Sequence, residues 1–282
     1  MPQTINTNIA SLNAQRNLNM SQASLATSMQ RLSSGLRVNS AKDDAAGLAI
    51  AERMNAQVRG MNVAIRNAND GISMAQTAEG ALSKVADSLQ RMRELALQSR
   101  NATNSDSDKN SLNKEFAELQ KEVARVLGGT TFNGKAILGA EGTSFTFQVG
   151  ANTTTDDVVT VDFDNMVSNA DISAVTATTA SIGSTADASA IASVIDNIDT
   201  ALDTLNDKRA TFGAMQSRFE AVISNLQVSV ENQAAAKSRI MDADFAAETA
   251  NMSRAQILQQ AGNAMVAQAN QLPQLVLRLL QG

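Results

Sequence analysis

The 282-residue sequence contains only two prolines, Pro2 and Pro273, so no proline interrupts the backbone hydrogen bonds of a helix between them. Within this stretch apolar side chains recur at alternating steps of four and three residues over about 44–99, 107–127 and 188–236, which is the spacing of one helix face. At about 1.5 Å per residue, the first helix would be roughly 80 Å long. The pattern predicts a mainly α-helical chain that forms an elongated antiparallel coiled-coil or helical-bundle rod.

A stretch of alternating apolar residues lies between the second and third predicted helices. Its apolar positions are Phe145, Phe147 and Val149, followed after a Thr- and Asp-rich turn by Val159, Val161 and Phe163. Alternation of this kind is typical of strands with one buried face, and two such runs joined by a turn predict a β-hairpin. Residues 165–187 are rich in Ser, Thr and Ala, and we expect a short variable, irregular linker there.

Both ends of the chain carry apolar stripes at helical spacing, and neither stripe has a partner beside it in the sequence. The N-terminal stripe consists of Ile5, Ile9, Leu12, Leu25, Met29, Leu32 and Leu36. The C-terminal stripe consists of Leu258, Met265, Leu272, Leu275 and Leu279. Such stripes form coiled-coil seams, so we expect the terminal helices to pair with each other and with neighbouring copies of the chain. These residues are therefore the candidate polymerisation surface.

The same features divide the chain into segments. Residues 1–43 and 237–282 are predicted to form the two halves of an inner domain of paired helices, and residues 44–236 an outer rod with three helices and the hairpin. Gly35 permits a bend after the first helix because it has no Cβ. Pro273 removes one backbone hydrogen bond and is expected to kink the last helix; the alternative is that the helix ends there.

The composition argues against catalysis, because the chain has no His, Cys, Trp or Tyr. Without His or Cys, the usual general base, thiol nucleophile and soft-metal ligands are missing. We therefore expect no enzymatic activity, no metal site and no cofactor. An enzyme based on carboxylates or lysine is the form of catalysis that this composition leaves open.

Charge and hydropathy bear on the partners of the chain. No Lys or Arg occurs between Lys135 and Lys208, whereas several acidic residues do, and this argues against nucleic-acid binding. No apolar run approaches the roughly 20 residues of a membrane span, and the N-terminus lacks the basic and apolar regions of a secretory signal. We expect neither nucleic acid nor membrane as a partner, and no cleaved signal peptide if the protein is secreted.

Four motifs resemble those of bacterial flagellin. They are Ile5–Asn13 (INTNIASLN), Arg31–Arg37 (RLSSGLR), Asn39–Ile50 (NSAKDDAAGLAI) and Gln260–Pro273 (QAGNAMVAQANQLP). The resemblance covers about residues 1–140 and 190–282, and the short middle corresponds to a form without extra outer domains. It implies a structural subunit of the flagellar filament that self-assembles through its terminal helices into a helical tube for swimming motility.

The resemblance also implies partners and a location. The chain would leave the cell through the flagellar type III apparatus and become part of the extracellular filament, with an export chaperone, the filament cap and hook-junction proteins as partners beside copies of itself. The segment Leu89–Leu97 resembles the one through which a vertebrate Toll-like receptor senses many flagellins, with Arg91, Leu95 and Glu115 at the matching positions. An exposed Leu95 beside Arg91 would supply an anchor for that receptor, and the same face would serve as a subunit contact.

Two other structural roles compete with the filament subunit. A hook–filament junction protein shares the terminal motifs but usually matches less well over the long helix of residues 44–100. A chemoreceptor-like signalling coiled coil is suggested by the Ala-, Gln- and Met-rich heptads. It would need a transmembrane anchor or a sensory domain, and the sequence contains neither.

Overall fold

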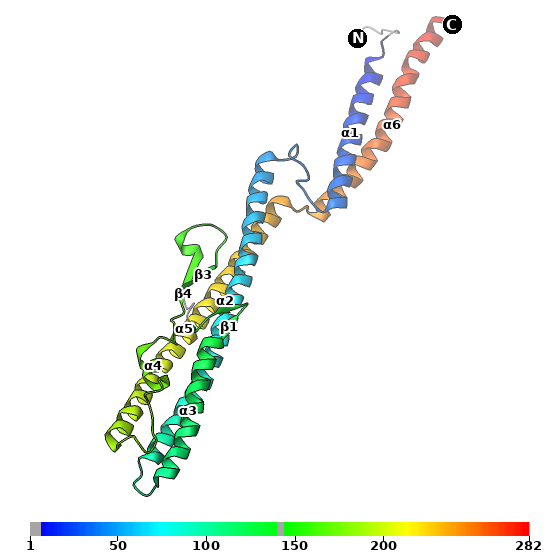
Figure 1. The fold of residues 1–282 in the computed structure, drawn as a ribbon. Helices are drawn as coiled ribbons and strands as arrows, with labels where there is room; N and C mark the ends of the chain where they lie inside the picture. Colours follow the sequence, from blue (N-terminus) through cyan, green and yellow to red (C-terminus); the bar gives the residue numbers. More distant parts are fainter. Residues whose placement is uncertain (1–6, 140–143, 282) are drawn as a thin grey trace. The chain divides into compact units, whose positions relative to one another are not determined.

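The computed structural model describes residues 7–139 and 144–281, the last ten of these by their backbone alone. In chain order its elements are α1 (Ile9–Ser34), α2 (Ala45–Ser99), α3 (Asp106–Gly129), β1 (Thr131–Phe132), β2 (Lys135–Ala136), β3 (Ser144–Gln148), the 3-10 turn η1 (Thr155–Asp157), β4 (Val158–Asp162), α4 (Ala170–Thr176), α5 (Ala188–Met241) and α6 (Phe245–Gln281), as Figure 1 shows. The predicted mainly α-helical fold with a small antiparallel sheet is confirmed.

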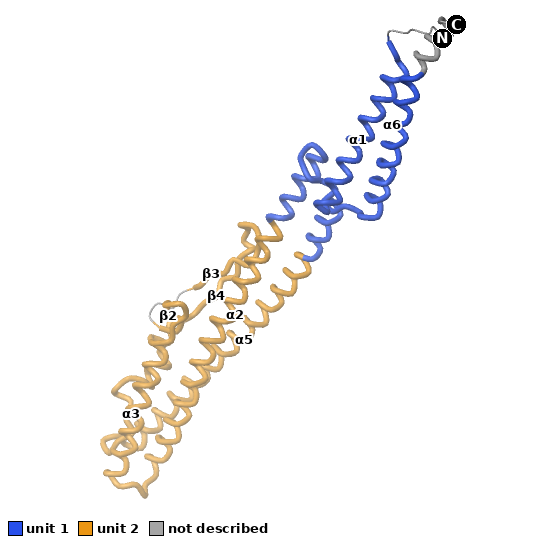
Figure 2. The backbone as a smooth tube through the Cα atoms, turned by 90° about the vertical axis from the view of Figure 1, so that its right-hand side faces the viewer, with its two compact units in different colours: residues 1–56, 231–282 blue, residues 57–230 orange. Residues whose placement is uncertain are grey.

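The chain forms two compact units, which Figure 2 draws in different colours. Residues 1–56 and 231–282 make up unit 1, and residues 57–230 make up unit 2. Unit 1 contains α1, α6 and the adjoining ends of α2 and α5, whereas unit 2 contains the rest of α2 and α5 with all the other elements. The division predicted from the sequence, after residues 43 and 236, stays a prediction.

Within unit 2, α2 and α5 lie side by side and run in opposite directions (Figures 1 and 2). Gln216 donates a hydrogen bond to the carboxylate of Glu79 at 3.0 Å. Further along α2, Arg93 donates to Asp199 at 2.6 Å. The partner numbers fall along α5 as they rise along α2, which is the signature of antiparallel packing. α3 returns beside α2 after the turn at residues 100–105.

The hydrophobic core of unit 2 follows the helical registers that the apolar spacing predicts. Side chains from α2, α3 and α5 meet there and are almost completely buried. They include Leu82, Leu89, Met92, Leu95, Phe116, Val123, Leu127, Ile198, Leu205, Phe212 and Phe219. Ala68, Ala75 and Ala78 on α2 are also fully buried, and small side chains of this kind allow two helix backbones to approach closely.

Two short antiparallel hairpins follow α3. In the first, Asn133 and Gly134 connect β1 to β2 with φ angles of 51° and 78°, both in the left-handed region that a tight hairpin turn requires. In the second, β3 pairs with β4 in a register that places Phe145 opposite Val161 and Phe147 opposite Val159. The hairpin that the alternating pattern predicts is therefore confirmed.

Aromatic contacts attach the second hairpin to α5. The ring of Phe147 meets that of Phe219 edge to face, with centroids 5.4 Å apart. Phe163, which follows β4, lies 5.1 Å from the ring of Phe212. Aromatic pairs in such geometries add stability beyond the area that they bury. The hairpin is thus part of the core of unit 2.

The segment 165–187, predicted to be irregular, contains the short helix α4. Its Ile172 and Val175 lie one turn apart and are fully buried, so this Ser- and Thr-rich segment contributes to the core. The amide of Gln120 on α3 donates to the carbonyl oxygens of Val175 at 2.8 Å and of Ala180 at 2.9 Å. The few apolar residues of this segment pack in the core, a role that its composition does not indicate.

Candidate assembly surface of the terminal helices

Residues at both ends of α1 satisfy backbone groups that the helix leaves unpaired. The side chain of Asn8 accepts a hydrogen bond from the backbone N–H of Ser11 at 3.0 Å, which caps the N-terminus. At the other end Gly35 adopts a left-handed conformation with φ of 71°, and its N–H donates to the carbonyl oxygen of Arg31 at 2.8 Å. Gly35 therefore terminates α1, and its action as a hinge stays a prediction.

Immediately after α1 the chain is hydrogen-bonded to the segment that links α5 to α6. Leu36 and Asp242 form an isolated antiparallel bridge. The backbone N–H of Arg37 donates to the carbonyl oxygen of Met241 at 2.6 Å, and its guanidinium donates to the carbonyl oxygen of Ile240 at 2.8 Å. These bonds join residues about 200 positions apart in the sequence. They hold the start of the α1–α2 connection against the start of the α5–α6 connection.

A tight polar turn precedes α2. The carboxylate of Asp43 accepts hydrogen bonds from the hydroxyl of Ser40 at 3.0 Å and from the backbone N–H groups of Ser40 and Asn39 at 2.9 and 3.2 Å. These bonds, the hydroxyl bond first, hold the pKa of Asp43 below its ordinary value, because they favour the charged carboxylate. Asp44 then accepts from the N–H of Gly47 at 2.8 Å at the start of α2.

In unit 1, α1 and α6 pack along a seam of mostly small or polar residues. Their buried and half-buried positions recur at steps of three and four residues, as in a coiled coil. On α1 they are Ser11, Ala14, Leu18, Ser21, Leu25, Ser28 and Leu32, and on α6 they are Glu248, Met252, Ala255, Gln259, Gly262, Val266 and Ala269. A Cβ placed on Gly262 would lie 3.2 Å from Leu18 Cδ1, so the two helices are in close contact.

Side-chain hydrogen bonds hold the far end of this seam, at the start of α1; its near end lies at the end of α1. Asn8 Nδ2 donates to the carbonyl oxygen of Ala269 at 2.7 Å. Ser11 Oγ donates to Asn270 Oδ1 at 2.7 Å, and Ser11 itself is buried. Both bonds join residues about 260 positions apart, so the pairing of the two chain ends is specific in register.

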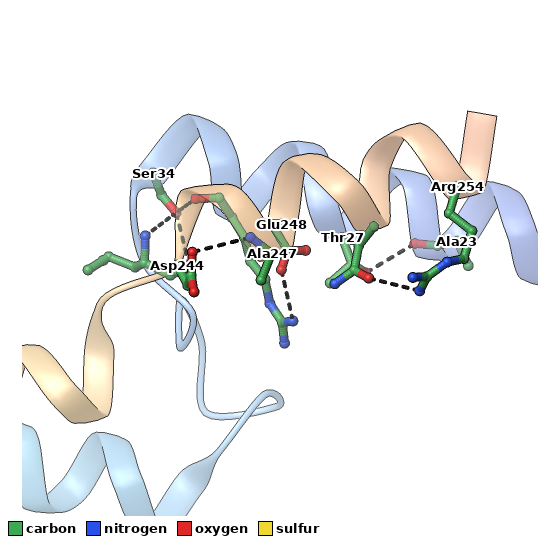
Figure 3. Close-up of polar contacts among 10 residues, drawn as sticks. Ala23, Thr27, Ser34, Asp244, Ala247, Glu248 and Arg254 are labelled. Atoms are coloured by element: carbon green, nitrogen blue, oxygen red, sulfur yellow. Dashed lines mark hydrogen bonds and ion pairs between the residues drawn. The ribbon is translucent and has the colours of Figure 1, made fainter. Parts of the chain in front are cut away.

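A polar groove lies along the near end of the seam, where Figure 3 shows residues of α1 and α6 side by side. Arg31 on α1 reaches the carboxylate of Glu248 on α6 at 4.0 Å, and Glu248 is buried. The groove is also lined by Thr27, Ser28 and Arg254. Charged and hydroxyl groups therefore share this part of the contact with Leu25, Leu32 and Met252, where a purely apolar seam was expected.

Several other large apolar side chains of the two helices remain exposed, and one of them, Leu258, also lines the groove. We call them the exposed apolar set: Ile9, Leu12, Met20 and Met29 on α1, with Ile257, Leu258 and Met265 on α6. Each of the seven is more than half exposed, with Ile9 at 68% and Ile257 at 66%; Phe245, at the start of α6, is also exposed but is not counted in this set. This many exposed large hydrophobics on one helix pair make it a candidate interaction surface. The pairing of α1 with α6 leaves this surface uncovered.

The predicted stripes thus divide between exposed and half-buried positions. Ile9, Leu12, Met29, Leu258 and Met265 belong to the exposed apolar set. The remaining described members are half-buried: Leu25 and Leu32 on the seam, and Leu36 just after α1. Ile5 lies outside the described residues, as do the side chains of Leu272, Leu275 and Leu279. The apolar spacing did not identify Met20 and Ile257 as exposed apolar residues, because Met20 is out of register with the N-terminal stripe and Ile257 with the C-terminal stripe.

Pro273 lies inside α6, which continues to Gln281. The alternative that the helix ends at this proline is therefore wrong. A proline within a helix removes one backbone hydrogen bond and clashes with the preceding turn. The kink predicted at Pro273 stays a prediction.

The receptor-like segment on α2 differs from expectation at one position. Arg91 is exposed and its guanidinium contacts Glu115 on α3 and Glu94 on its own helix, each at 2.9 Å. These contacts raise the pKa of Arg91, first through the bond to Glu94 and then through Glu115. Leu95, expected to be exposed, is fully buried in unit 2, so that expectation is wrong. Because α2 packs against both α3 and α5, its buried face is wider than one stripe, and the neighbouring Leu97 is the exposed leucine.

Two other kinds of site come into question for the described part of the chain: a metal centre and a membrane-spanning helix. Among the described residues, the Asp and Glu side chains nowhere gather in groups of three or more that could hold a metal ion. None of its helices combines the length and the hydrophobicity that a membrane-spanning helix needs.

Comparison with known proteins gives two family matches. The model for the bacterial flagellin N-terminal helical region matches residues 5–143. The model for the bacterial flagellin C-terminal helical region matches residues 195–280. Together they cover α1, α2, α3 and α6 almost completely, together with most of α5.

Relatives align along the whole chain. A flagellin of Halalkalibacterium halodurans is 46% identical over 277 residues, which cover 98% of this chain and 99% of the relative. A flagellin of Xenorhabdus nematophila is 43% identical over 324 residues, with complete coverage of both chains. A flagellin of Bacillus subtilis is 39% identical over 305 residues, covering 98% of this chain and 99% of the relative.

Proposed function

The chain belongs to the bacterial flagellin family and is a structural subunit of the flagellar filament, and we propose that it polymerises through the exposed apolar set of α1 and α6. The alternatives, a hook–filament junction protein and a chemoreceptor-like signalling coiled coil, are not favoured, because flagellins match the chain from end to end.

The observation that supports this surface is that the pairing of α1 with α6 buries different residues from those that stay exposed. The seam between α1 and α6 contains mostly small and polar residues, including the buried Ser11, Ser28 and Ala255. The seven larger apolar side chains remain exposed. Covering one such side chain completely contributes about 1.5–3 kcal/mol, so their burial between neighbouring copies would drive association. We include Ile5, Leu272, Leu275 and Leu279 in the proposed surface on the strength of the sequence pattern.

Seeded polymerisation tests this proposal. We expect purified protein, heated, cooled and mixed with short filament fragments, to grow long tubes visible by electron microscopy. The variants Leu12→Gln and Leu258→Gln are expected to raise the critical concentration for growth about tenfold or more each, because an apolar contact is replaced by a polar group. Growth at an unchanged critical concentration in both variants would contradict the proposed surface.

Val228→Gln is the matched control, since Val228 is an exposed apolar residue of unit 2 that lies outside the exposed apolar set. It should change the critical concentration less than either terminal variant. Circular dichroism of all three monomers is needed to establish equal helix content. An effect of Val228→Gln as large as that of Leu258→Gln would show that polymerisation responds to exposed apolar area in general.

The resemblance to flagellins further supports an assembly route. We propose that the protein is exported by the flagellar type III apparatus with a chaperone, is added beneath the filament cap, and meets hook-junction proteins at the filament base. We also propose that residues 1–43 and 237–282 form the inner domain and residues 44–236 the outer one. Cells lacking the export apparatus should retain the protein, and limited proteolysis of the monomer should cut first near the proposed boundaries. Normal secretion without the apparatus would contradict the route.

Of the three residues predicted to contact a receptor, Arg91 and Glu115 remain accessible, and we propose them as the contact. Their side chains are about half exposed and paired with each other across α2 and α3, which leaves them accessible to a Toll-like receptor or to a neighbouring subunit. In a receptor reporter assay, Arg91→Ala should lower signalling without changing the unfolding of the monomer. Leu95→Ala should instead destabilise unit 2, because Leu95 is buried. Unchanged signalling by Arg91→Ala would contradict the receptor role.

The flagellin family is structural, and we infer that this chain has no catalytic activity of its own. The absence of His and Cys from the sequence supports this inference, because those residues most often act as general bases and nucleophiles. Purified protein incubated with peptide, ester and glycoside substrates should release no more product than buffer does. Turnover that copurifies with the protein and disappears on unfolding would contradict it.

A further inference from the structure

Methionine is the side chain of this protein that two-electron oxidants attack most readily. The chain contains 12 methionines and has no Cys, Trp, Tyr or His to compete for an oxidant. A thioether reacts with a hydroperoxide according to its exposure to solvent. The positions of the methionines in the fold therefore decide where oxidation occurs.

The exposed methionines of the described chain lie in unit 1 and the buried ones in unit 2, whereas Met54, Met241 and Met252 of unit 1 are half-buried. In unit 1, Met20, Met29 and Met265 are exposed by 61%, 51% and 59%. In unit 2 the methionines are buried in the core: Met61, Met74, Met92, Met166 and Met215. All three exposed thioethers belong to the exposed apolar set, so the most oxidisable atoms of the described chain lie on the surface proposed for polymerisation.

We propose that Met20, Met29 and Met265 form a reversible oxidation site that controls assembly, with a hydroperoxide as the oxidant. The thioether sulfur attacks the terminal oxygen of the hydroperoxide, the O–O bond breaks, an S–O bond forms, and the proton of the attacked O–H passes to the departing oxygen. Water or an alcohol leaves; the sulfur loses two electrons, and the peroxide gains them. A dithiol reductant reverses the step by taking the oxygen as water while its two thiols form a disulfide.

The consequence follows from the polarity of the product, and this step rests on the proposed polymerisation surface. A sulfoxide is polar and chiral, and it places a strong hydrogen-bond acceptor where an apolar group was. Burying such an acceptor without a donor opposes association. Oxidation of the free subunit should therefore block its addition to a filament. In a finished filament the same thioethers are covered by neighbouring copies and react slowly.

The first measurement is the rate of oxidation at each methionine. Monomer and assembled filament are treated with dilute hydrogen peroxide, the reaction is quenched with free methionine, and peptides are analysed by mass spectrometry. In the monomer Met20, Met29 and Met265 should oxidise several times faster than Met74 and Met92. In the filament their rates should fall toward those of the buried group. Equal rates at all five positions in the monomer would overturn the assignment of the site.

The second measurement is growth of the oxidised subunit on unoxidised seeds. Oxidation limited to the three exposed methionines should raise the critical concentration about tenfold or more, and methionine sulfoxide reductase with a dithiol should restore it. The triple variant Met20→Leu, Met29→Leu and Met265→Leu should assemble normally and keep its critical concentration after peroxide, because Leu has nearly the volume of Met.

The matched control replaces buried methionines instead: Met61→Leu, Met74→Leu and Met92→Leu should leave peroxide sensitivity intact. Oxidised wild type that grows as well as untreated protein would overturn this inference while leaving the proposed function standing. Untreated protein that does not grow on seeds would overturn both, and a peroxide-sensitive exposed-Leu variant would show that the three thioethers are not responsible.

Discussion

The ring of Phe219 on α5 lies directly against the backbone of Gly71 on α2, so that a Cβ placed on Gly71 would come within 2.8 Å of the ring. Phe219 is fully buried, and its ring also packs edge to face on Phe147 of the second hairpin. It cannot retreat without disturbing that contact. Gly71 therefore sets how closely α2 and α5 approach within unit 2.

Gly71→Ala should therefore destabilise the protein relative to a Gly→Ala substitution at an open position of α2. Gly80 has nothing near its missing Cβ, so Gly80→Ala should stabilise the protein by about 1 kcal/mol through helix propensity. Gly71→Ala should be less stable than Gly80→Ala by about 1–3 kcal/mol, because it overpacks the core. Urea unfolding of both variants measures the difference. An equal gain from both would show that the ring yields freely.

Gly35 is expected to resist replacement for a conformational reason. Its φ of 71° costs an L-residue roughly 1–2 kcal/mol, while the nearest side-chain atom, Phe245 Cζ, is 3.9 Å from the Cβ position and leaves room for a methyl group. Gly35→Ala should destabilise unit 1 by about that amount, and Gly35→Asn by less, since Asn tolerates this region. Thermal unfolding followed by circular dichroism tests both. Gly213→Ala, in an open helical position, should be neutral or stabilising.

Gln120 is expected to hold the segment around α4 in place. Its amide nitrogen donates to the carbonyl oxygens of Val175, Ala177 and Ala180, and Gln120 is itself buried. Gln120→Leu removes the donor to the carbonyl oxygens of Val175 and Ala180 and should cost about 1–3 kcal/mol, whereas the carbonyl oxygen of Ala177 keeps its bond from the N–H of Ala180. Hydrogen exchange over residues 172–182 should accelerate. Gln90→Leu, at an exposed position of α2, is the control, and equal protection in the two variants would contradict the assigned role.

The start of α3 should respond to acid. Ser105 and Asp108 form a reciprocal capping box, and the bond from the Ser105 hydroxyl, followed by that from its backbone N–H, lowers the pKa of Asp108. A lowered folded pKa means that the cap contributes fully above the ordinary aspartate value of about 3.9 and is lost as the pH falls through the folded value. Hydrogen exchange at the first turn of α3 should differ between wild type and Ser105→Ala at neutral pH. That difference should shrink in acid, to what the uncharged bond from the Asp108 N–H to Ser105 Oγ contributes; persistence of the full difference there would be inconsistent with a charged cap.

The helices and the second hairpin could be predicted from the sequence because their signals are local. The recurrence of apolar residues identifies α2, α3 and α5, and the alternation of Phe145, Phe147 and Val159 identifies the strands β3 and β4. The short helix α4 was missed, since its Ser- and Thr-rich sequence carries only two buried apolar residues.

The burial of Leu95 could not be predicted from local sequence signals. Its place on a helix follows from the sequence, yet its burial depends on α3 and α5 covering two sides of α2 at that level. Arg91, one turn earlier, remains exposed and paired with Glu115. A periodic pattern states which residues share a face and does not state how many neighbours cover that helix.

By itself the sequence determined that the two ends form long amphipathic helices with motifs of the flagellin family, and it placed the candidate polymerisation residues on them. Only the tertiary structure decided which face of each helix is used within the chain. Small residues such as Ser28 and Ala255 let α1 and α6 approach closely and hydrogen-bond, so they form the seam and leave Leu12 and Leu258 exposed. Hydrophobicity along one helix measures its tendency to be buried, whereas the shape of the partner determines which face is covered first.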